Sequence, residues 1–297
     1  MEEIIKKIGN VDFEITFDCN LRCLHCYNES HIVKNELCLN KIYDIIDQIS
    51  NLGFKEIHIN GGEPLKHSNI LEILNYCNDK GLETLLETNA TLLSSKIISE
   101  LANIEYLKIR ASIDGPEKIH NLIRRTNEDI NPYTKAIDNL SLANSKNIPV
   151  QITTSVNNIN YENIKELAQD LHNNGLNDLR LRLTMPSSSG YDHWQILKLN
   201  KEKIELLKKD IDYISINHPI LLDSAFLFRT SPKIEQKCFI TPQGNVKPYS
   251  FIDSYAGNLN DLSLKEIIGK YESVNFPEKI EKMMTNYLIE LGMVVTK

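Results

Sequence analysis

The chain has 297 residues, of which 41% are hydrophobic and 25% are charged, and its formal net charge at pH 7 is −7. This length allows one large domain, or one domain with an appendage, whose core needs no disulfide framework. The acidic balance excludes a broadly basic surface for nucleic acid, and the lack of a long apolar run or a signal peptide argues against a membrane protein and favours the cytoplasm.

Strand and helix signals alternate over the first two thirds of the chain, after a short lead-in at residues 1–10. The predicted strands are short runs of β-forming residues, and the predicted helices have apolar residues at helical spacing. Strands are expected at 13–17, 56–59, 83–87, 106–113, 150–156 and 179–183. Helices are expected at 39–52, 70–80, 95–101, 133–144 and 162–173. This α/β alternation predicts a parallel sheet with right-handed crossovers, and six such units can form a partial (β/α)6 TIM-like barrel.

The alternation stops near residue 200. The later elements are expected to be a helix at 200–214, strands at 237–241 and 246–249, and helices at 264–270 and 278–291. The two strands flank a Pro-Gln-Gly-Asn sequence that suits a hairpin turn. We therefore expect two parts, a barrel over residues 1–222 and a small α+β C-terminal extension over residues 223–297, packed on the barrel.

Three of the six cysteines lie close together directly after the first predicted strand. Cys19, Cys23 and Cys26 have the spacing C-x3-C-x2-C, and thiolates are soft ligands for zinc, copper(I) or iron–sulfur iron. The loop supplies no obvious fourth ligand. A closed structural zinc site wants four protein ligands, whereas a four-iron cluster held by three cysteines keeps one iron open.

The other unusual sequences also follow predicted strands. Gly61-Gly62-Glu63-Pro64 follows the second strand, Thr88-Asn89-Ala90-Thr91 the third, and Ser112-Ile113-Asp114-Gly115-Pro116 ends the fourth. Loops after the carboxyl ends of parallel strands converge in space and carry the chemistry of such folds. We expect these loops and the cysteine loop to face one pocket.

The two motifs together, in this order and each at a strand end, resemble the radical S-adenosylmethionine (AdoMet) enzymes. The resemblance covers roughly residues 11–190 and continues more weakly to about residue 270. It implies a partial barrel in which Cys19, Cys23 and Cys26 bind one [4Fe–4S] cluster and AdoMet chelates the open iron. It also implies that a flavodoxin- or ferredoxin-type donor reduces the cluster, and that the 5′-deoxyadenosyl radical from AdoMet takes a hydrogen atom from the substrate.

The resemblance also assigns AdoMet contacts to residues of this sequence. His25 matches a residue that touches the adenine, and Gly61, Gly62 and Glu63 match the segment that binds the methionine amino group. Asn89 and Ser112 match contacts to the ribose or the methionine carboxylate, and Arg124 matches an arginine that pairs with that carboxylate. From the residues alone, Gly61-Gly62 could be only a turn, Asn89 only an Asx turn, and Arg124 a solvated surface charge.

The Ser112–Pro116 sequence with Arg124, and the region from Cys238 to about residue 268, resemble the subgroup with a SPASM or twitch extension. Relatives bind extra clusters there through several cysteines. Here Tyr249 stands where a cysteine is usual, and Cys238 is the only cysteine after Cys77. We expect a degenerate extension without an auxiliary cluster. Cys238 is either a hydrogen-atom donor to a substrate radical or a buried small hydrophobe.

Two substrate classes remain open. The subgroup resemblance favours a peptide-modifying maturase or epimerase, although the few residues before the first strand leave no room for a leader-binding domain. The alternative is a small molecule such as a sugar, a nucleoside or a tetrapyrrole precursor. The non-enzymatic alternative is a zinc-bound interaction domain in which His25 or His31 supplies the fourth ligand.

Overall fold

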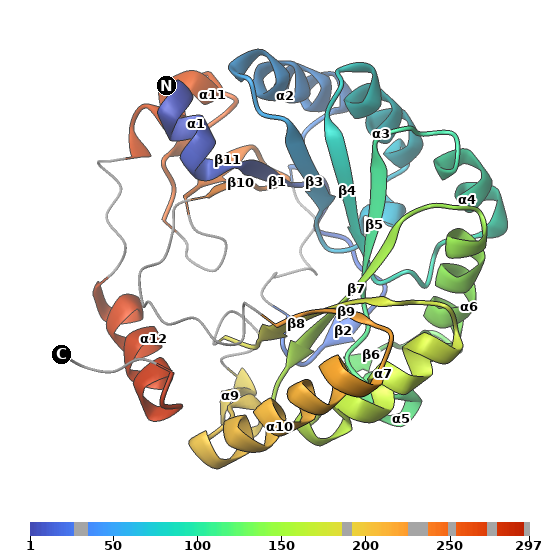
Figure 1. Ribbon diagram of the computed structural model, residues 1–297. Coiled ribbons are helices and arrows are strands. Elements are labelled where there is room, and N and C mark those ends of the chain that lie inside the picture. The colour runs from blue at the N-terminus through green and yellow to red at the C-terminus, as the bar shows by residue number, and fades with distance from the viewer. Residues whose placement is uncertain (27–34, 186–191, 225–236, 249–253, 272–277, 294–297) are drawn as a thin grey trace.

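The computed structural model describes residues 1–26, 35–185, 192–224, 237–248, 254–271 and 278–293, and its main feature is a curved ten-stranded sheet with helices along its outer side (Figure 1). The strand order is β12-β11-β10-β1-β3-β4-β5-β7-β8-β9. All neighbours from β10 to β9 pair in parallel, and only β10–β11 and β11–β12 are antiparallel. A separate ribbon pairs β2 with β6.

The bounds of the elements are as follows. The strands are β1 (Asn10–Glu14), β2 (Arg22–Cys23), β3 (Glu56–Asn60), β4 (Glu83–Thr88), β5 (Leu107–Ser112), β6 (Arg124–Arg125), β7 (Val150–Val156), β8 (Asp178–Leu183), β9 (Leu221–Asp223), β10 (Cys238–Ile240), β11 (Asn245–Lys247) and β12 (Gly257–Asn258). The helices are α1 (Glu2–Ile8), α2 (Leu39–Leu52), η1 (Pro64–Lys66), α3 (Ile70–Asp79), α4 (Ser95–Leu101), α5 (Glu117–Ile123), α6 (Pro132–Ser145), η2 (Tyr161–Asn163), α7 (Ile164–Asn173), α9 (Trp194–Leu197), α10 (Lys201–Asn217), α11 (Leu264–Ile268) and α12 (Glu278–Glu290).

The six predicted strands correspond to β1, β3, β4, β5, β7 and β8, which lie side by side in chain order and confirm the α/β partial barrel. The prediction for residues 1–10 was wrong in one respect. This lead-in contains the helix α1, whose Ile5 and Ile8 are buried. The first strand also begins earlier than predicted, at Asn10, and ends at Glu14. The short helix α5 was not predicted.

The C-terminal hairpin continues the barrel sheet. Strand β10 pairs in parallel with β1, with Val11 opposite Cys238, so β10 to β12 extend the sheet beyond its first strand. Helix α11 begins beside α2, where Leu264 N donates to Gln48 Oε1 at 2.7 Å. A separate C-terminal unit from residue 223 onward stays a prediction. No helix in the described ranges is long and apolar enough to cross a membrane.

The two faces of the sheet differ in chemistry because successive side chains of a strand point to opposite faces. On the outer face, which the helices cover, lie apolar residues that are at most 2% exposed, such as Val11, Ile57, Leu86, Ile109 and Ile152. The inner face carries charged and polar residues. The barrel core is therefore the layer between sheet and helices.

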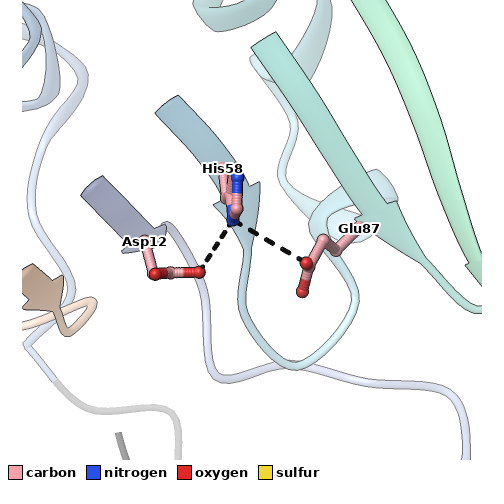
Figure 2. A group of neighbouring side chains, drawn as sticks. All are labelled: Asp12, His58 and Glu87. Atoms are coloured by element: carbon pink, nitrogen blue, oxygen red, sulfur yellow. Dashed lines mark hydrogen bonds and ion pairs between the residues drawn. The ribbon is translucent and has the colours of Figure 1, made fainter. Parts of the chain in front are cut away.

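His58 on β3 lies at the centre of one ionic group on the inner face (Figure 2). Its Nδ1 is 3.0 Å from Asp12 Oδ1 and 3.9 Å from Glu87 Oε1, and its Nε2 is 2.7 Å from Glu56 Oε1. Burial opposes the protonated ring, but the hydrogen bonds to Asp12 and Glu56 outweigh it and raise the pKa of His58 to about 9. Asp12, His58 and Glu87 are close enough to share a metal ion. The contacts that His58 makes to Asp12 and Glu56 are those of ion pairs, and we interpret the group in this way.

The same face continues as a chain of contacts toward β8. Arg110 on β5 donates from Nη1 to Glu87 Oε1 and from Nε to Gln151 Oε1, both at 2.8 Å. Gln151 Nε2 donates to Asp178 Oδ1 at 2.9 Å, and Lys108 Nζ reaches Asp178 Oδ2 at 3.0 Å. We call the residues that make these contacts the inner belt. They are Asp12, Glu56, His58, Glu87, Lys108, Arg110, Gln151 and Asp178.

Replacing His58 by Gln should remove a pH-dependent part of the stability. The pKa of His58 is about 9 in the folded protein and ordinarily 6.5, so protonation stabilises the fold fully below pH 6.5 and the effect is lost as the pH rises through 9. The free energy of unfolding that wild type loses over this pH range through His58 should be on the order of 3 kcal/mol. Urea unfolding at about pH 6 and about pH 9.5 measures it. Equal losses in wild type and His58→Gln would contradict the prediction.

Candidate functional site

The cysteine loop is fastened to the segment that follows α5. Its strand β2 pairs with β6, so that Cys23 lies opposite Arg124, and Leu24 N donates to Ile123 O at 3.0 Å. Cys26 N donates to Cys23 O at 3.3 Å, which closes a turn around His25. The loop therefore lies at the carboxyl end of the sheet, as predicted.

Burial strongly affects the protonation of two of the cysteine thiols. Burial, with a smaller contribution from Cys26, raises the pKa of Cys19 to about 11 and of Cys23 to about 12. Without a metal these thiols hold their protons, and a metal centre would replace them. The three thiols of the loop fit a four-iron cluster that keeps one iron open, whereas a closed zinc site would need a fourth protein ligand.

Gly61 and Gly62 let two backbone segments come into contact. A Cβ on Gly61 would lie 2.4 Å from Thr16 O, and one on Gly62 would lie 2.4 Å from Asp18 O. Gly61 also has a φ of +147°, which disfavours other residues. Gly62 N donates to Thr16 O at 2.8 Å, and Glu63 N donates to Asp18 O at 2.7 Å. The motif thus holds the residues directly before Cys19.

The Glu63 carboxylate is fully buried and joins the ends of β3 and β4. It accepts hydrogen bonds from Thr88 Oγ1 at 2.6 Å, Asn89 N at 2.8 Å and Leu65 N at 3.1 Å. Burial raises its pKa, and these donors oppose the rise. Asn89 in turn donates from Nδ2 to Asn20 Oδ1 at 2.9 Å. Both side chains position the loops around the cysteines, and their contacts to AdoMet stay a prediction.

Asp114 is the centre of the second half of the site, and the sequence interpretation gave it no role. Its carboxylate is completely buried. Oδ2 lies 2.7 Å from His25 Nε2 and accepts from Arg124 Nε at 2.7 Å, while Oδ1 accepts from Ser155 N at 2.9 Å. Burial would raise the pKa of Asp114, but the charges of Arg124 and His25 keep it well below its usual range. In the sequence, the only feature that pointed to Asp114 as a site residue was its place in the Ser112–Pro116 motif.

Arg124 is buried, with 9% of its surface exposed, which excludes a solvated surface charge. Its Nη1 donates to Cys23 Sγ at 3.6 Å, so one guanidinium contacts both Asp114 and a cysteine of the loop. His120 lies beside Arg124 and Asp114. Burial and the Arg124 charge lower the pKa of His120 to about 3, so its neutral Nδ1 accepts from Asp114 N at 3.2 Å.

Among the predicted AdoMet contacts, Ser112 is half-buried. It is the last residue of β5, and its side chain makes no hydrogen bond within the part of the chain that the structure describes. Asp114, two residues further along the chain, pairs with Arg124 and so places Ser112 close to this ion pair. The structure therefore brings together the cysteines, His25, Arg124, the Gly61–Glu63 turn, Asn89 and Ser112 along one edge of the sheet.

Cys238 lies apart from this edge. It is completely buried on β10, opposite Val11, so its sulfur points to the helix-covered outer face. Burial raises its pKa to about 12, and it shares a hydrogen bond with Tyr271. The packing is that of a buried small hydrophobe, and the hydrogen-donor role stays a prediction. Tyr249 and His31 lie outside the described residues.

Comparisons with known proteins agree on a family. The profile of the Radical SAM superfamily matches residues 13–172. AdoMet-dependent heme synthase from Methanosarcina barkeri is 25% identical over 299 residues, covering 86% of this chain and 81% of the synthase. Mycofactocin maturase MftC from Mycolicibacterium smegmatis is 27% identical over 192 residues, covering 61% of this chain and only 48% of the maturase.

A solved structure of Streptococcus suis SuiB bound to its precursor peptide SuiA has a TM-score of 0.74 and 17% identity, covering 90% of this chain and 67% of SuiB. At that identity the likeness shows the fold alone, and it confirms the partial barrel. The superfamily profile covers more than half of the chain. The chain therefore belongs to the radical SAM superfamily, whose enzymes use a [4Fe–4S] cluster and AdoMet.

Proposed function

We propose that this chain cleaves AdoMet reductively and removes a hydrogen atom from a substrate at the carboxyl end of the barrel. Cys19, Cys23 and Cys26 hold one [4Fe–4S] cluster. The observation that carries the proposal is the loop itself: three buried or half-buried thiols, fixed beside the Gly61-Gly62 turn.

When bound, the reduced cluster supplies the electron that splits AdoMet, and the adenosyl fragment supplies the hydrogen abstraction. The residues of the chain hold these groups in place. Asp114 fixes His25 toward the adenine and Arg124 toward the AdoMet carboxylate and Cys23. Ser112 and Asn89 would supply polar contacts, and the Gly61–Glu63 segment would bind the amino group. A flavodoxin- or ferredoxin-type protein supplies the electron, in the cytoplasm.

Anaerobic reconstitution tests the proposal. Wild type should bind about four irons per chain and form 5′-deoxyadenosine from AdoMet on reduction. Cys23→Ala should lose most of the bound iron and most of the 5′-deoxyadenosine formation, because it removes a cluster ligand. Cys38→Ala is the matched control, because Cys38 is exposed at the start of α2. This variant should keep both the iron and the 5′-deoxyadenosine formation. A colourless protein with zinc and no iron would contradict the proposal, and about eight irons would contradict the single cluster.

For the substrate we propose a peptide, so that the enzyme is a maturase or epimerase. The Ser112–Pro116 sequence with Arg124 supports this class, as does the similarity to mycofactocin maturase. A small molecule is the second candidate. It is favoured by the similarity to AdoMet-dependent heme synthase, which covers 86% of this chain, whereas the maturase match covers 61%.

Deuterium transfer separates the two classes. Reduced enzyme is incubated with AdoMet and either deuterated candidate peptides or deuterated small molecules. The 5′-deoxyadenosine should gain deuterium in the peptide arm, because the abstracted atom moves to the adenosyl fragment. Mass spectrometry of 5′-deoxyadenosine is the measurement. Deuterium gained only from the small-molecule arm would assign the second class instead.

The hydrogen-donor role of Cys238 has its own test. If its thiol returns a hydrogen atom to the substrate, Cys238→Ala should keep AdoMet cleavage but change or lose the final product. Cys77→Ala is the matched control, because Cys77 is equally buried, on α3. Product analysis by mass spectrometry decides, and unchanged products with Cys238→Ala would exclude the role.

A further inference from the structure

Three buried side chains form a closed ring of hydrogen bonds between the cysteine loop and the loop after β4. Asn20 Nδ2 donates to Thr91 Oγ1 at 2.9 Å, Thr91 Oγ1 donates to Asn89 Oδ1 at 2.6 Å, and Asn89 Nδ2 donates to Asn20 Oδ1 at 2.9 Å. The three residues are between 3% and 8% exposed. Buried polar side chains that pair with one another are held rigidly, and we call this group the Asn–Thr ring.

The backbone fixes the direction of every bond in this ring. Thr91 N donates to Asn89 Oδ1 at 2.9 Å, so this atom is the oxygen of the amide and not its nitrogen. Asn89 Nδ2 must then face Asn20, which can accept only with its Oδ1. Asn20 Nδ2 therefore faces the Thr91 hydroxyl, whose own proton goes to Asn89. Removing any one donor leaves a buried partner unpaired, so the ring depends on all three side chains.

Asn20 lies at the centre of a turn that reaches the sulfur of the first cysteine. Leu21 N donates to Cys19 Sγ at 3.4 Å across this residue. Arg22 Nη1 holds the carbonyls of the turn, donating to Cys19 O at 2.8 Å and to Leu21 O at 2.9 Å. The ring holds the Asn20 side chain. The turn is thus fixed through both its backbone and its side chain, which keeps Leu21 N on the sulfur.

An N–H group on a cysteine sulfur affects a cluster that must be reduced. In the proposed reaction one electron passes from the flavodoxin- or ferredoxin-type donor, which is oxidised, to the cluster, which gains one negative charge. A hydrogen-bond donor stabilises the more negative form, and hydrogen bonds to the sulfurs are among the features that set the reduction potential of such clusters. Holding Leu21 N in place therefore makes the cluster easier to reduce.

We propose that Asn20 is a positioning residue which, through the Asn–Thr ring, holds Leu21 N on Cys19 Sγ and so raises the reduction potential of the cluster. The proposal rests on the proposed function, which puts a cluster on Cys19. It assigns a role to Asn20 and Thr91, to which the sequence interpretation gave none. Thr91 hydrogen-bonds to Asn20 and Asn89 rather than to a cysteine, so replacing it tests the path through Asn20.

Redox titration of the cluster-loaded protein tests the proposal, with the reduced cluster measured by electron paramagnetic resonance. AdoMet is left out, so that the predicted AdoMet contact of Asn89 does not contribute. Thr91→Val keeps the shape of the side chain but removes the hydroxyl, which opens the ring. The equilibrium constant for reduction should fall about tenfold, the effect of losing a hydrogen bond to a charged group, and the potential should fall by about 59 mV.

Two variants control for packing and stability. Thr91→Ser keeps the hydroxyl and should change the equilibrium constant for reduction by less than about twofold, because the ring stays closed. Thr84→Val makes the same substitution on β4, where Thr84 is 2% exposed and its Oγ1 donates to Leu82 O at 3.1 Å. It removes a buried hydroxyl outside the ring, so it should lower the stability of the fold and leave the potential at the wild-type value.

Hydrogen–deuterium exchange of the cluster-free chain supplies a second measurement, which also covers a Thr91→Val protein that binds no cluster. The peptide containing Asn20 and Leu21 should exchange about tenfold faster in Thr91→Val than in wild type, because the turn opens more often. In Thr84→Val this peptide should exchange as it does in wild type.

An unchanged potential in Thr91→Val would overturn the proposal, and so would equal shifts in Thr91→Val and Thr84→Val. If Thr91→Val binds no cluster, exchange at Leu21 equal to that of wild type would overturn it. A wild type without iron would contradict the proposed function, and faster exchange in Thr91→Val would then still show that the ring holds the turn. A wild type with four irons and the same potential in every variant would contradict the role of the ring alone.

Discussion

The buried carboxylate of Asp114 is the contact on which the candidate site depends. It joins three parts of the chain: the cysteine loop through His25, strand β6 through Arg124, and β7 through Ser155 N. A charge without solvent is stable only when it is paired and hydrogen-bonded. Removing one partner of a buried ion pair typically costs about 3–5 kcal/mol. The carboxylate therefore fixes the geometry of the loop more firmly than a solvated pair would.

The barrel interior follows from a division between the two faces of the sheet. The outer face supplies hydrophobic stabilisation through apolar residues under the helices. The inner face is free to carry charge, and the inner belt uses that freedom, from Asp12 on β1 to Asp178 on β8. Each belt residue is held by its neighbours, so the polar surface offered to a ligand is set before binding. Such fixed dipoles and charges cost no reorganisation when a ligand arrives.

The local elements could be predicted because their patterns are strong. The helices at 39–52 and 95–101 were predicted with the bounds observed, and the six predicted barrel strands lie within three residues of their predicted bounds, whereas the short strand β9 was missed. The helix α1 was missed because it is short, with two buried isoleucines. The pairing of β10 with β1 could not be predicted, since no local pattern encodes a partner more than two hundred residues away.

The candidate site was predictable to the extent that spacing encodes it. The cysteines and the glycine turn have fixed spacing within a loop, whereas Asp114 acquires its importance from partners that only the fold brings near. Sequence spacing thus identifies the predicted cluster ligands more readily than the carboxylate that positions them.

The contacts of Arg124 show how one side chain can serve several groups. A guanidinium has five N–H donors in a fixed plane. One of them, on Nε, donates to Asp114, and one on Nη1 donates to Cys23 Sγ, which leaves three. The predicted contact to the AdoMet carboxylate can therefore be added without breaking either observed bond. Lysine could not do this, because its ammonium is a point charge without a fixed fork. The geometry thus explains how an arginine at this position can join the carboxylate centre to the cysteine loop and still make the predicted contact to AdoMet.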